Sequence, residues 1–87
     1  MNSDTLAQTY ARHGNKWFYV STVNRDSSAV EFNSRYAETL VWEYDPTTKF
    51  LGKLIGQFED TENEITRHQD VVVKLHKTGK TQEDDEL

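Results

Sequence analysis

Residues 36–58 show the clearest alternation of apolar and polar positions in the chain, and this pattern predicts a β-hairpin. Asp45 and Pro46 stand at the first two positions of its turn, where a type I turn favours them. When Tyr44 is paired with Phe50, most of the large apolar side chains fall on one face, and a slip of one residue would disperse them. That face consists of Tyr36, Glu38, Leu40, Trp42, Tyr44, Phe50, Gly52, Leu54, Gly56 and Phe58. We therefore expect it to form the core side of the hairpin.

Residues 16–23 are nearly all of types that favour β-structure, and they predict a further strand. Trp17 and Tyr19 share one of its faces, and Phe18 and Val20 share the other. Only one of these two sets can join a core that is covered by a single helix. The other set has to lie under another segment or in an interface.

A helix is predicted between residues 61 and 79. Thr61 and Glu64 have the spacing of a capping box, and Gly79 stands where a helix commonly ends. Side chains recur at intervals of three and four residues at Ile65, His68, Val72 and Leu75. We expect this stripe to pack against the sheet.

Together these elements predict an α+β fold, in which a three-stranded antiparallel sheet carries a C-terminal helix on one face. Residues 2–13 fit either a short N-terminal helix or a frayed terminus. Residues 24–35 form a long polar connection of a kind that is often functional or mobile. We expect one domain over residues 1–79 and an acidic disordered tail over residues 80–87.

The composition restricts the sites that this chain can hold. Cysteine is absent, which excludes disulfides and thiolate metal sites, and the three histidines are not spaced as ligands of one ion. The net charge of −5 argues against a nucleic-acid-binding domain, which would carry a basic face. The chain shows neither a signal peptide nor an apolar run long enough to cross a bilayer. We expect a cytoplasmic protein without metal, cofactor or catalytic residues.

Glu38 and His68 are the polar exceptions on the two apolar surfaces predicted above. A buried carboxylate needs a partner, and His68 is the polar member of the helix stripe. Such a pair could act as an acid and a base, but the pattern places no nucleophile or phosphate-binding loop beside it. We therefore interpret Glu38 and His68 as a structural hydrogen-bonded pair that fixes how helix and sheet dock.

The chain is short, has few apolar residues and lacks disulfides, which favours self-association. One helix covers only one face of a sheet, so the other face needs a cover. We expect a two-fold homodimer that uses either the Trp17/Tyr19 strand or a face containing Ala37, Val41 and Ile55.

Three segments resemble a group of small uncharacterised proteins from bacteriophages and some bacteria. The segments are Val-Ser-Thr-Val at 20–23, Tyr-Ala-Glu-Thr-Leu-Val-Trp-Glu at 36–43, and His68 in a late helix. This chain departs from the shared outline by the inserted Ala37 and by Trp42, where phenylalanine is usual. The resemblance implies a phage origin and carries no activity with it.

The sequence therefore favours a small non-enzymatic protein-binding module that acts on a host or phage protein. The alternative is a protein that binds a small molecule or a nucleotide, using the 24–35 connection and the Glu38/His68 region. A pocket between sheet and helix would favour the alternative, whereas a flat aromatic sheet face would favour protein binding.

Overall fold

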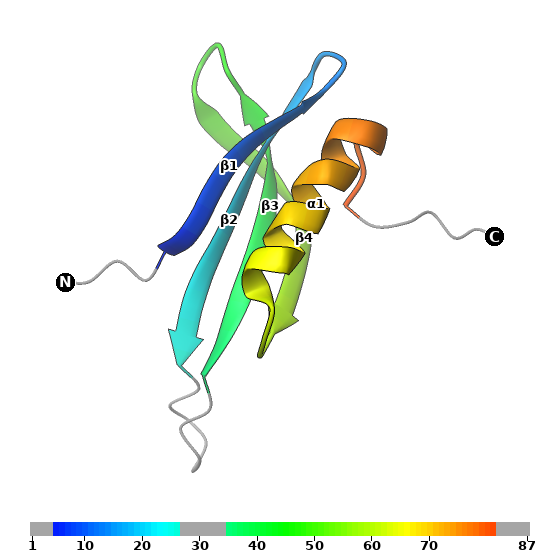
Figure 1. The fold of residues 1–87 in the computed structure, drawn as a ribbon. Helices are drawn as coiled ribbons and strands as arrows, with labels where there is room; N and C mark the ends of the chain where they lie inside the picture. Colours follow the sequence, from blue (N-terminus) through cyan, green and yellow to red (C-terminus); the bar gives the residue numbers. More distant parts are fainter. Residues whose placement is uncertain (1–4, 27–34, 82–87) are drawn as a thin grey trace.

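Four antiparallel strands pair in the order of the chain and form one sheet in the computed structural model, which describes residues 5–26 and 35–81 (Figure 1). The strands are β1 (Thr5–His13), β2 (Lys16–Asp26), β3 (Arg35–Asp45) and β4 (Phe50–Asp60). The helix α1 (Glu64–Thr78) follows them and packs on one face of the sheet, mainly against β1 and β2. The α+β arrangement with a C-terminal helix is as expected.

The prediction of three strands is wrong, because residues 5–13 form the strand β1 rather than a helix or a frayed end. Gly14 and Asn15 make a two-residue turn between β1 and β2, and Gly14 has a φ of 64° there. Short turns with positive φ match the twist of paired strands. Gly14 therefore closes a hairpin between two strands.

The predicted register of the second hairpin is also wrong. Phe50 pairs with Asp45 instead of Tyr44, and Leu54 pairs with Trp42. Two irregularities, one on each side of Leu54, each add a residue to β4 relative to β3. β2 and β3 pair without irregularity, so the side chains of β3 alternate in step with those of β2. Ala37, Thr39 and Val41 therefore lie beneath the helix, whereas Leu40 and Trp42 lie on the opposite face. Small and β-branched side chains let the helix approach the sheet closely.

The core lies between α1 and the sheet. Its buried apolar residues are Ala11, Phe18, Val20, Val41, Val71 and Leu75, with Ile55, Phe58 and Val72 packed at its margin. Of the predicted helix stripe, His68 and Leu75 are buried, but Ile65 is 43% exposed and Val71 takes a core position. The buried side of the helix is thus rotated slightly from the predicted one.

Both ends of α1 are tied to the sheet. At the start, the helix begins after Asn63 rather than Thr61, and Arg67 forms a bidentate contact with Asp60 at 3.0 and 3.2 Å. At the end, the Nδ1–H of His13 donates to the carbonyl of His76, while the Nδ1–H of His76 donates to the carbonyl of Arg12. These reciprocal bonds hold the helix end against the first hairpin.

Gly79 ends the helix as predicted, with a φ of 73° and an N–H that donates to the carbonyl of Leu75. A Cβ at this position would approach the His13 ring to 2.9 Å, whereas a Cβ at Gly14 would meet nothing within 4 Å. Gly79→Ala is therefore expected to lower the free energy of unfolding by more than Gly14→Ala, which costs only the left-handed backbone strain of about 1 kcal/mol. Urea denaturation of both variants measures the difference, and equal losses would contradict the contact.

The predicted domain boundary after residue 79 lies two residues before the end of the described part of the chain. Thr81 follows the helix and lies against Gly56 of β4, where an added Cβ would approach the Thr81 methyl to 2.9 Å. Residues 82–87, which make up most of the predicted tail, and residues 27–34 of the predicted connection lie outside the described residues.

Candidate functional site

The face of the sheet opposite α1 carries both tryptophans and all four tyrosines of the chain. Strand alternation places Tyr10, Trp17, Tyr19, Tyr36, Trp42 and Tyr44 there. The face beneath the helix takes Phe18 and Phe58 instead. The aromatic residues are thus sorted by polarity, since those with an O–H or N–H lie on the open side.

Five of these side chains form a contiguous cluster, which we call the aromatic face: Tyr10, Trp17, Tyr19, Trp42 and Tyr44. The ring of Tyr10 lies 5.2 Å from that of Tyr19 and 4.7 Å from that of Tyr44, and the rings of Tyr19 and Trp42 stack at 5.9 Å. The Arg12 guanidinium lies 5.7 Å from the Trp17 ring. Such spacings are those of attractive aromatic and cation–π pairs.

The open face divides into an aromatic half and a polar half along the strands. At the end near the two turns, the paired rows are Arg12–Trp17–Tyr44–Leu51 and Tyr10–Tyr19–Trp42–Leu54. Toward the other end, the rows are Gln8–Ser21–Leu40–Gln57 and Thr5–Val23–Glu38–Glu59. Tyr10 is 51% exposed, and Leu51 and Leu54 are 47% and 43% exposed. Apolar surface is therefore concentrated in one half.

The aromatic half of the open face carries little net charge. Partial desolvation, followed by the nearby Tyr10, raises the pKa of the Tyr44 hydroxyl above its ordinary value of 10.0, so this group stays protonated. Arg12 is the charged residue of the two aromatic rows. A surface of this kind offers hydroxyl groups and rings to a partner rather than net charge.

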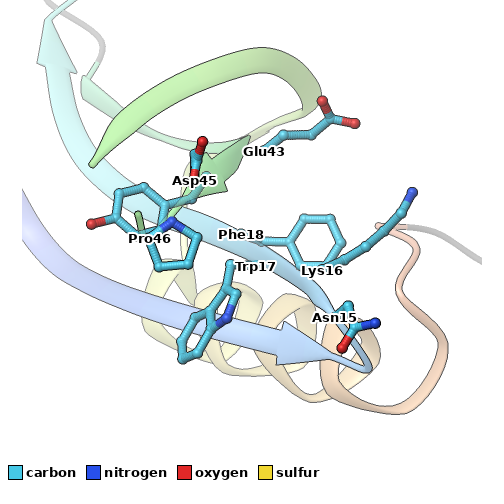
Figure 2. A pocket seen from close by; sticks show the side chains of 8 residues that line it. Asn15, Lys16, Trp17, Phe18, Glu43, Asp45 and Pro46 are labelled. Atoms are coloured by element: carbon cyan, nitrogen blue, oxygen red, sulfur yellow. The ribbon is translucent and has the colours of Figure 1, made fainter. Parts of the chain in front are cut away.

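A pocket of about 370 Å³ opens beside the aromatic face at the turn end of the sheet (Figure 2). It is lined by Asn15, Lys16, Trp17, Phe18, Glu43, Tyr44, Asp45 and Pro46. A second depression of about 380 Å³ shares Glu43, Tyr44 and Asp45 and is bordered by Phe50. Hydrogen bonds from the Thr47 and Thr48 backbone lower the pKa of Asp45, which keeps its carboxylate charged. Rings beside carboxylates suit a positively charged side chain.

The predicted Glu38–His68 pair is wrong, although both side chains are buried as expected. His68 faces the sheet from α1, whereas Glu38 lies on the opposite face and accepts a hydrogen bond from the side chain of Gln57. The two residues were assigned to one side because the hairpin register was misjudged. Because Glu38 lies on the face opposite α1, the sheet itself stands between Glu38 and His68.

His68 instead joins a network of threonine hydroxyls. Its Nε2 lies 2.8 Å from Oγ1 of Thr9, its Nδ1 lies 2.8 Å from Oγ1 of Thr22, and Thr22 lies 2.7 Å from Thr39. A neutral imidazole donates from one nitrogen and accepts at the other, and the hydroxyls can rotate to match either tautomer. Burial lowers the pKa of His68 below its ordinary value of 6.5. The network therefore fits a structural role.

The four residues predicted for an interface do not lie together. Trp17 and Tyr19 belong to the aromatic face, but Val41 is fully buried beneath the helix and Ile55 packs against the same core. The proposed Ala37, Val41 and Ile55 contact face is therefore wrong. Three members of the aromatic face were missed as contact residues: Tyr10, Trp42 and Tyr44. The two-residue Gly14-Asn15 turn was the available signal, because it places Tyr10 on a strand beside Tyr19.

Within residues 5–26 and 35–81, no group of three or more histidine, aspartate or glutamate residues could hold a metal ion. Over the same part of the chain, no helix has the length and apolar character needed to cross a membrane. No protein-family model, curated protein or solved structure matches this chain. The resemblance to small phage proteins thus stays a prediction.

Proposed function

We propose that this chain is a small, non-enzymatic protein-binding module that uses the aromatic face as its contact surface. The observation that carries this proposal is the gathering of tyrosine, tryptophan and Arg12 on a sheet face that α1 leaves uncovered. These three residue types are the ones most enriched among residues that dominate binding energy at protein interfaces. The resemblance noted above implies a phage origin and no activity, and on that origin we propose that the module acts on a host or phage protein in the bacterial cytoplasm.

The distribution of large side chains supports the same conclusion. Beneath the helix, Phe18 is the fully buried aromatic residue of the core cluster, and its neighbours there are alanine, valine and leucine. The open face holds more ring surface than this core. Exposed apolar patches on small proteins commonly mark contact sites, because leaving them in water costs about 25 cal/mol per Å² relative to burial.

Small-molecule binding at the Glu38/His68 region has less support. The two residues lie on different faces, and His68 is 4% exposed with both ring nitrogens hydrogen-bonded to Thr9 and Thr22. A ligand at His68 would have to displace this hydroxyl network.

Photo-crosslinking in bacterial cells tests the proposal. Tyr10→p-benzoylphenylalanine places the probe on the aromatic face, and Val73→p-benzoylphenylalanine places it on the helix at a matched exposure of 50%. We expect protein adducts from position 10 and few or none from position 73. An absence of adducts from position 10, or equal yields from both positions, would refute the aromatic face as a contact surface.

A further inference from the structure

We infer that the occupant of the aromatic face is a second copy of this chain, packed face to face about a two-fold axis parallel to the strands. This inference rests on the proposed function, since it names the partner of the same surface. It would make the assembly a sandwich of two four-stranded sheets with one helix on each outer side.

The aromatic and polar halves of the open face indicate the direction of the two-fold axis, because only one direction brings the two aromatic halves together. An axis parallel to the strands exchanges β1 with β4 and β2 with β3, and it keeps each paired row at its own level. The aromatic half of one copy then meets the aromatic half of the other. An axis across the strands would instead place the aromatic rows on the rows that contain Gln57 and Glu59.

The parallel axis also gives complementary contacts across the interface. Tyr10 of one copy lies over Leu54 of the other, and Tyr19 lies over Trp42, each contact occurring twice as a two-fold interface requires. The acidic residues are kept apart, because Glu38 faces Val23 and Glu59 faces Thr5 of the other copy. The two acidic residues of these rows therefore do not face each other across the interface.

The open face has about the footprint of one side of a standard interface, although Ser21 and Glu38, each 6% exposed, contribute little of it. Four strands spaced about 4.8 Å apart and roughly 30 Å long give a footprint on the order of 600 Å². Protruding side chains raise the accessible area to about the 800 Å² that each partner buries in an interface of standard size. Sheets packed in this way lie about 10 Å apart, with their strands rotated by about 30°.

Light scattering after size-exclusion chromatography tests the association. We expect the native chain to show twice its 10.1 kDa mass at micromolar concentration. Tyr10→Glu, which alters a half-exposed residue, is expected to halve the measured mass while leaving the circular dichroism spectrum unchanged. Val73→Glu is the matched control on the helix and should keep the dimer mass. A native chain of monomer mass, or a Tyr10→Glu variant that stays dimeric, would overturn the inference.

Thiol cross-linking tests the axis, and it profits from the absence of native cysteine. Gln8→Cys and Gln57→Cys place thiols on exposed positions of β1 and β4 in the same paired row. With a short bismaleimide, a mixture of the two variants should cross-link strongly, whereas Gln8→Cys alone should not. Preferential Gln8–Gln8 linkage would refute the parallel axis.

The photo-crosslinking result separates this inference from the proposed function. Adducts at position 10 that contain only foreign proteins, together with a monomer mass, would reject the homodimer and leave the binding function standing. The absence of any adduct would reject both.

Discussion

Replacing Phe18 by alanine is expected to lower the free energy of unfolding by about 3–5 kcal/mol. Phe18 is 2% exposed and is the large aromatic residue of the core between β2 and α1. Truncation removes its ring from an apolar environment and leaves a cavity that its β-branched neighbours cannot fill. Since small domains are stable by only about 5–15 kcal/mol, the variant should be close to unfolded at room temperature. Urea denaturation followed by circular dichroism at one fixed protein concentration measures the loss.

Phe50→Ala is the matched control for this experiment. Phe50 is 72% exposed at the start of β4, so the same truncation there should change the unfolding free energy by only about 0.5 kcal/mol or less. Comparable losses in the two variants would contradict the assignment of β2 faces. A loss below about 1 kcal/mol for Phe18→Ala would do the same.

Acidification from pH 7 to pH 5 is expected to destabilise the fold through His68. Burial lowers the pKa of His68 in the folded chain, whereas the unfolded chain titrates at the ordinary value of 6.5. Below that value, the unfolded chain binds a proton that folded His68 does not, which shifts the equilibrium toward unfolding. The contribution of His68 is therefore fully present above pH 6.5 and is lost as the pH falls below it. Denaturation midpoints at several pH values measure this dependence.

His68→Gln is the informative variant, because an amide can donate and accept hydrogen bonds among the threonines without titrating. It should be less stable than the native chain at pH 7 and should lose less stability between pH 7 and pH 5. His13 and His76 are unchanged in the variant, so their contribution cancels in the comparison. Equal pH slopes in the two proteins would show that His68 does not carry the effect.

The helix and the strand at β2 were predictable because their signals are local. The β-forming run from Lys16 to Val23, the turn at Asp45 and Pro46, and the stop at Gly79 each depend on neighbouring residues only. β2, the turn between β3 and β4 and the end of α1 lie where these signals place them. The polar burial of Glu38 and His68 was also predictable, since both stand among apolar positions.

The hairpin register could not be predicted from which face of the hairpin carries the larger apolar side chains. The heavier face of β3, which contains Trp42 and Tyr44, was expected in the core, but Val41 and the smaller side chains beside it lie there. Two factors explain why the face with the larger side chains lies outside the core. The helix needs a shallow surface on which to pack, and the irregularities in β4 bring Phe58 and Gly56 to the helix side. Irregularities of this kind leave little trace in a pattern with a period of two residues.

Two of the five residues of the aromatic face could be anticipated. Trp17 and Tyr19 were recognised as a surplus face, because one helix cannot cover both sides of a strand. Tyr10 was missed, since the four-residue spacing of Leu6 and Tyr10 resembles a helix turn. That Trp42 and Tyr44 belong to the aromatic face could be seen only from the pairing of β2 with β3, which sets them beside Tyr19 and Trp17.

The irregular edge of β4 also bears on whether this molecule can polymerise. A sheet whose two edges differ could add β1 of one molecule to β4 of the next, and such head-to-tail pairing propagates into fibres. The two extra residues near Leu54 interrupt the even spacing of backbone groups along β4, which makes it a poor template. The regular run from Ala7 to His13 on β1 then pairs more readily with its own equivalent than with β4, and that pairing closes on itself after two molecules. A chain with so much exposed ring surface is thereby protected from unlimited growth through its strands.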